Sequence, residues 1–106
     1  MATGLFGYFS FRINGNDIDG DYFNNLTSGL FPEIAVRTSS PSTTFNGSFN
    51  SSYKDGAVSK TAILTIHPPN SNGEFILEWF ENATSVVYEG KGRVKHGELV
   101  GYYHKK

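Results

Sequence analysis

The chain contains no cysteine among its 106 residues. This excludes disulfide bonds, thiolate nucleophiles and cysteine-ligated metal sites, so core packing and backbone pairing must hold the fold together. Charge is also scarce, because charged residues make up 18% of the chain and leave a net charge of -1. Without a broad basic surface, binding to DNA or RNA is not expected.

Long apolar runs are missing as well. No stretch approaches the roughly 20 apolar residues that a membrane-spanning helix needs. The first residues, 1–6, lack the basic and apolar parts of a secretory signal. We therefore expect a soluble, cytoplasmic protein with no membrane span, unless the chain is the mature form of a secreted one. Its length fits one domain that covers residues 1–106.

Aromatic residues are abundant instead: the chain has nine Phe, six Tyr and one Trp. They favour strands and fill cores with few side chains. Residues 86–95 show the typical alternation, since Tyr88, Gly90 and Gly92 share one side and mostly charged residues take the other. His96-Gly97 then predicts a tight turn, with the glycine able to adopt a positive φ.

The same alternation recurs along the whole chain. It predicts about eight strands, over residues 5–13, 18–23, 33–38, 44–53, 57–67, 75–80, 86–95 and 98–103. Residues 24–32 are expected to form a loop or one helical turn. Several glycines share the apolar side of their strands, which favours a curved barrel over a flat sandwich. The predicted fold is all-β, a single antiparallel up-and-down barrel whose interior is either filled or holds one small ligand.

The closing strands resemble those of calycin-type barrels, the group of lipocalins, fatty-acid-binding proteins and avidins. The resemblance covers the C-terminal third and rests on the motifs Phe75-x-Leu77-x-Trp79, Tyr88-Glu89-Gly90-x-Gly92 and Gly97-x-Leu99-x-Gly101-x-Tyr103. It implies a lipocalin-like barrel with an open mouth and an apolar interior. It implies no particular ligand and no catalytic residue, and a single tryptophan argues against biotin as the ligand.

Metal and cofactor motifs fail when their spacing is tested. Residues 17–21 carry three aspartates and a glycine, as calcium loops do. Aligning Gly20 with the loop glycine puts Gly15 at the first ligand position and Leu26 at the bidentate one, which excludes an EF-hand. The three histidines have no spacing that directs them to one metal. We predict neither a metal nor a cofactor.

The favoured function is a noncatalytic binding barrel that takes a small, largely apolar molecule into its interior or open end. Aromatic walls would supply burial and the glycines would supply room. The candidate ligand-binding residues are Phe9, Phe11, Phe45, Phe49, Phe75, Leu77, Trp79, Tyr88 and Tyr103. The strong alternative is that the same residues simply form a filled core.

A second reading is a carbohydrate- or protein-binding surface module on the polar side of residues 44–53. Sugars pair hydroxyls with amides and stack on aromatic rings, which Asn46, Ser48, Asn50 and Tyr53 could provide. Outward-facing apolar side chains are also compatible with a homodimer.

A third reading is an enzyme on a related barrel. Its candidate residues are His67, Glu78 and Tyr102, because general acid–base catalysis needs such ionisable groups around one substrate.

Overall fold

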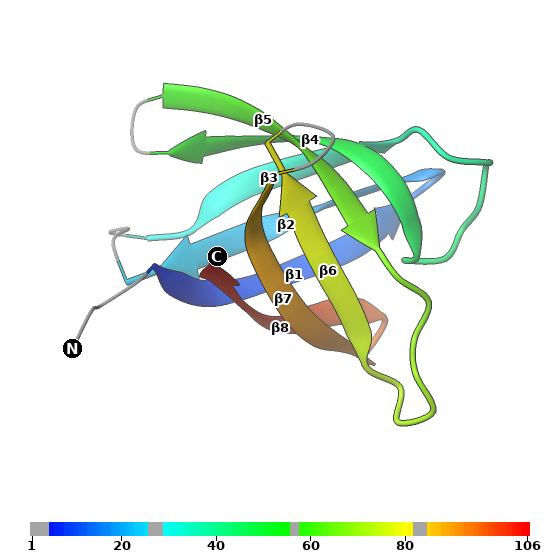
Figure 1. Ribbon diagram of the computed structural model, residues 1–106. Coiled ribbons are helices and arrows are strands. Elements are labelled where there is room, and N and C mark those ends of the chain that lie inside the picture. The colour runs from blue at the N-terminus through cyan, green and yellow to red at the C-terminus, as the bar shows by residue number, and fades with distance from the viewer. Residues whose placement is uncertain (1–4, 26–28, 56–57, 82–84) are drawn as a thin grey trace.

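The computed structural model describes residues 5–25, 29–55, 58–81 and 85–106 and contains eight strands. Every strand pairs antiparallel with the next, and the last pairs with the first, so the sheet closes into a barrel (Figure 1). The strands are β1 Phe6–Asn14, β2 Asp17–Asn24, β3 Phe31–Arg37, β4 Gly47–Asp55, β5 Val58–Ile66, β6 Phe75–Phe80, β7 Val86–Lys95 and β8 Glu98–Lys105. The predicted fold class is confirmed.

Two tight turns set the register of their hairpins. His96 and Gly97 both have positive φ, 53° and 81°, which matches the right-handed twist of the flanking strands β7 and β8. Gly15, with φ 65°, serves the hairpin of β1 and β2 in the same way. The same rim of the barrel also carries two longer connections, one between β3 and β4 and one between β5 and β6.

Two predicted strand starts differ from the structure by two residues or more. β3 begins at Phe31, so Pro32 lies inside it, near the start of a strand where proline is tolerated. β4 begins at Gly47 rather than three residues earlier. The carbonyls of Thr44 and Asn46 accept hydrogen bonds from the Arg37 side chain, which takes the place of strand pairing. Residues 26–28 lie outside the described residues.

The interior is built from alternate residues of all eight strands. Its buried apolar members are Phe9, Phe11, Ile18, Tyr22, Ala35, Phe45, Phe49, Ala62, Leu64, Ile66, Phe75, Leu77, Trp79, Leu99 and Tyr103. Glycine permits a close strand approach where Gly92 pairs with Gly101, because a Cβ on Gly101 would run into the carbonyl of Lys91. The barrel wall can bend sharply there because no side chain has to fit.

The barrel has two rims, which we name after two residues of β3. Odd-numbered strands begin and even-numbered strands end at the Glu33 end, so β1 starts and β8 finishes there (Figure 1). The Arg37 end is the opposite rim. Among the described residues there is no helix of a length and apolar character suited to crossing a bilayer.

Candidate functional site

A buried carboxyl group lies inside the barrel at the Glu33 end. Glu33 points inward from β3 and is only 4% exposed, whereas the next residue, Ile34, points outward and is 55% exposed. Its Oε2 accepts hydrogen bonds from Ser51 Oγ at 2.5 Å and from Trp79 Nε1 at 2.7 Å. Since Trp79 belongs to β6, which is not a neighbour of β3, the second bond spans the barrel interior.

The two oxygens of Glu33 are unequally engaged. Both hydrogen bonds end on Oε2, and among the described residues none reaches Oε1. In this part of the chain no fully enclosed side-chain oxygen or nitrogen lacks a hydrogen-bond partner. Oε1 is therefore not fully enclosed.

Among the described residues, no lysine, arginine or histidine forms a salt bridge with this carboxylate. All lysines, arginines and histidines fall in the described ranges, and each is exposed except Arg37, which is engaged at the other rim. Burial raises the pKa of Glu33, and the hydrogen bonds from Ser51 and Trp79 oppose that rise only in part. A carboxyl in this position holds its proton or needs a cation from outside the protein.

Aromatic rings surround the carboxyl, with Tyr103 at their centre. Its ring centroid lies 5.8 Å from that of Trp79, 5.9 Å from that of Tyr88 and 6.3 Å from that of Tyr22. The Tyr103 hydroxyl accepts a hydrogen bond from Asn24 Nδ2 at 2.9 Å, and burial raises the pKa of Tyr103 to about 12. The phenol stays protonated at neutral pH and keeps its own proton to donate.

Tyr22 closes the side of this cluster nearest β4. Its hydroxyl donates to the carbonyl of Lys54, and its ring meets that of Tyr53 edge-on at 6.2 Å. Burial, followed by the nearby Glu33, raises the pKa of Tyr22. Tyr53 and Tyr88 are half-buried and form the rim of the cluster.

The nine predicted ligand-binding residues all belong to the interior, but they divide into three layers. Trp79, Tyr88 and Tyr103 lie at the Glu33 end, with the Phe9 ring 5.9 Å from Trp79. The enclosed middle layer consists of Phe11, Phe49 and Leu77. The third layer, at the Arg37 end, is the pair Phe45 and Phe75, whose ring centroids are 6.3 Å apart. Ligand binding by any of them stays a prediction.

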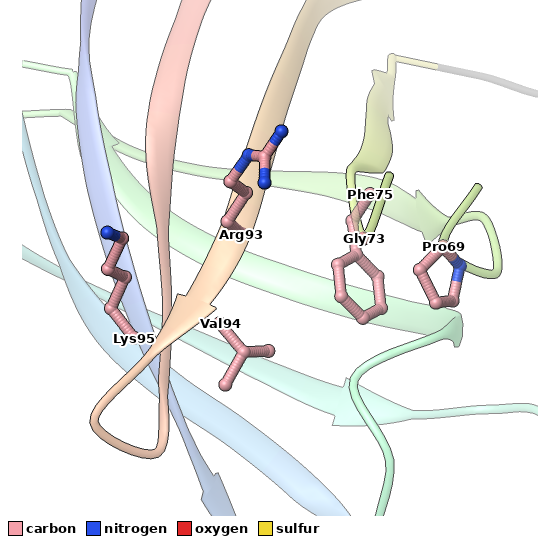
Figure 2. A pocket seen from close by; sticks show the side chains of 6 residues that line it. All are labelled: Pro69, Gly73, Phe75, Arg93, Val94 and Lys95. Atoms are coloured by element: carbon pink, nitrogen blue, oxygen red, sulfur yellow. The ribbon is translucent and has the colours of Figure 1, made fainter. Parts of the chain in front are cut away.

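The Arg37 end carries an open surface pocket of about 500 Å³. Its lining residues are Pro69, Gly73, Phe75, Arg93, Val94 and Lys95. In Figure 2, Phe75 lies between Pro69 and Val94. The pocket opens broadly to solvent and holds no buried polar group, so it offers less to fix the orientation of a ligand than the cluster around Glu33.

The candidate residues for catalysis lie on the outer wall. His67, directly after β5, has its Nε2 2.6 Å from Oε1 of Glu78 on β6, and both side chains are partly exposed. Tyr102 points outward from β8 and is separated from that pair by β7. The structure brings two of the three residues together.

The predicted polar surface keeps the amide of Asn50 and loses its aromatic ring. Asn50 faces solvent from β4, as the alternation predicts. Tyr53 instead turns its ring toward Tyr22 on the inner side.

Sequence reasoning missed Glu33 as a site residue. Ile34 and Val36 follow it in the sequence and have the apolar character of core residues, yet both face solvent. One signal was present on the neighbouring strand: Ser51 lies on the same side as Phe49 and Tyr53, and a polar residue within an apolar row marks a polar feature inside.

Comparison of the chain with protein-family models, with curated proteins and with solved structures finds no match.

Proposed function

We propose that this protein is a noncatalytic, lipocalin-like barrel that binds a small, largely apolar molecule at its Glu33 end. One observation carries the proposal: a buried carboxyl group, ringed by aromatic side chains, keeps one oxygen that no described residue engages. Ligand sites in proteins combine apolar walls with a few placed polar groups in the same way.

The room for a ligand lies at the rim rather than in the middle layer. Phe11, Phe49 and Leu77 are almost completely enclosed and pack as a core. Toward the rim, the rings of Tyr53 and Tyr88 are only half-buried. A ligand that displaces the Tyr88 ring outward would rest against Trp79 and Tyr103 and place its polar group at Glu33 Oε1.

Native mass spectrometry of protein purified from its own host tests this function. We expect a stoichiometric small molecule that can be extracted, identified and added back. Because Trp79 is the one tryptophan of the chain and donates to Glu33, its fluorescence emission should shift on rebinding. A ligand-free mass, together with unchanged emission when apolar probes are added, would contradict the proposal.

Exposed aromatic side chains support a second candidate function, the binding of a saccharide by the outer wall. Tyr8, Phe23 and Tyr102 lie side by side on β1, β2 and β8, and the Tyr8 and Phe23 rings are 5.3 Å apart. Such rings can stack on sugar faces. Titration with oligosaccharides would test it: Tyr8→Ala should abolish binding, whereas the outer-wall change Ile63→Ala should leave it intact.

A further inference from the structure

We infer that the ligand of the Glu33 end carries a protonated amine, which pairs with Glu33 Oε1 and lies against the rings of Trp79 and Tyr103. This inference rests on the proposed function and specifies its ligand class. It starts from a charge imbalance inside the barrel: an acid is buried there, and no described lysine, arginine or histidine is buried with it or forms a salt bridge with it.

The hydrogen-bond pattern favours a donor from outside. Ser51 and Trp79 both donate to Oε2, so the protein already supports one oxygen as an acceptor. Oε1 is the accessible acceptor that is left, and an ammonium group is a donor with the opposite charge. A hydrogen bond between charged partners is about twice as strong as one between neutral partners.

The walls favour the same ligand class. A cation is attracted to the face of an aromatic ring, most strongly to tryptophan and then to tyrosine. Trp79 and Tyr103 lie 5.8 Å apart, centroid to centroid, beside the carboxyl group. An anionic ligand would meet both the Glu33 charge and the electron-rich ring faces, and would be repelled by each.

Three probes of one shape and different charge test the inference: phenethylamine, phenethyl alcohol and hydrocinnamate, titrated calorimetrically into the full chain at neutral pH. We expect phenethylamine to bind most tightly. Glu33→Gln should weaken the binding of phenethylamine about tenfold or more, since this substitution removes the charge of the side chain and keeps its shape. It should leave phenethyl alcohol unchanged. The matched control is Glu78→Gln, which removes a glutamate from the outer wall and should change neither affinity.

The pH dependence of the wild-type protein gives a second readout that does not require the variant to fold. The other titratable groups facing Glu33 are the phenols of Tyr22, Tyr53, Tyr88 and Tyr103, and Lys60 is exposed at the rim of β5. Phenols titrate far above the acidic range. Affinity for phenethylamine should therefore fall as acid protonates Glu33, while affinity for phenethyl alcohol stays level.

The outcomes separate the two proposals. If phenethyl alcohol or hydrocinnamate binds as tightly as phenethylamine, the inference of an amine ligand is wrong, but the proposed binding function is unaffected. The same conclusion follows if the Glu33→Gln variant binds phenethylamine as tightly as the wild-type protein. Tighter binding of phenethylamine at acidic pH would also contradict the inference of an amine ligand. If no probe binds and native mass spectrometry shows no cargo, both proposals fail.

Discussion

Each end of β3 carries one charged side chain that points inward, and the two differ in how many of their polar atoms are hydrogen-bonded. Arg37 uses its side chain to bind the carbonyls of Asn16, Thr44 and Asn46, and its guanidinium carbon lies 4.6 Å from the centroid of the Phe49 ring. Glu33, four residues earlier on the same inner side, is supported on one oxygen only. All three nitrogens of the Arg37 side chain donate hydrogen bonds within the protein, whereas one oxygen of Glu33 accepts no hydrogen bond from a described residue.

Such a difference separates a structural charge from a candidate functional one. The Arg37 side chain joins the β1–β2 turn to the connection between β3 and β4, and its backbone N–H donates to Asp17 Oδ1 at 3.0 Å. Replacing Arg37 would remove its side-chain contacts and destabilise the folded state. By contrast, burial of an acid without a cation opposes folding at neutral pH. Substitutions at the two ends should therefore change stability in opposite directions.

The largest effect is expected from Arg37→Met, which keeps much of the apolar stem and removes every side-chain hydrogen bond. We expect the free energy of unfolding to fall by about 2–4 kcal/mol, because the carbonyls of Thr44 and Asn46 lose their donor. Urea denaturation measures it. The control is Arg93→Met on the exposed side of β7, where about 0–0.5 kcal/mol is expected. Equal losses in both variants would remove the distinction between the two ends.

Glu33→Gln should act in the opposite direction and stabilise the protein at neutral pH by about 1–2 kcal/mol. Because the pKa of Glu33 is raised by folding, the native state binds the extra proton, and wild-type stability should fall as pH rises above the ordinary glutamate range. The variant should lack this decline, so the two proteins should converge in acid. Melting temperatures across the acidic to neutral range would show it. A variant that is less stable at every pH would contradict the expectation.

Ser51→Ala should have a smaller effect, a loss of about 1 kcal/mol, since Glu33 Oε2 keeps only its bond from Trp79. The Ser51 hydrogen bond lowers the pKa of Glu33, so its removal should move the pH-dependent decline in stability to higher pH. Thermal unfolding over a pH series gives both quantities. Ser52→Ala, on the solvent side of β4, is the matched control and should change neither. An unchanged decline in Ser51→Ala would show that this bond does not tune Glu33.

The smallest effect is expected on the outer wall. Glu78→Gln breaks the exposed pair with His67 and should cost about 0–0.5 kcal/mol. Chemical denaturation at low and high salt measures it. A loss as large as that of Arg37→Met would mean that the outer wall, rather than the rims, holds the important charges.

The sequence was sufficient for the fold because alternation and turn residues act locally. His96-Gly97 sets a hairpin by its own backbone preferences, and the alternation in residues 86–95 sets which side faces in. The charges of β3 could not be placed in this way. Glu33 is adjacent to Ile34, whose hydrophobicity points to the opposite register, and the partners of Arg37 are loop carbonyls that only the folded chain brings near. Trp79 was correctly expected inside, but its bond across the barrel depends on β3 and β6 facing each other.

The most direct test follows the side-chain carboxyl carbon of Glu33 by NMR during a pH titration, with and without saturating phenethylamine. We predict a midpoint above the ordinary glutamate value in the free protein, because burial raises this pKa and no described lysine, arginine or histidine lowers it. Phenethylamine should move the midpoint down, since it binds the ionised form. A midpoint at or below the ordinary value, unchanged by the amine, would contradict both the buried, unneutralised acid and the site built on it.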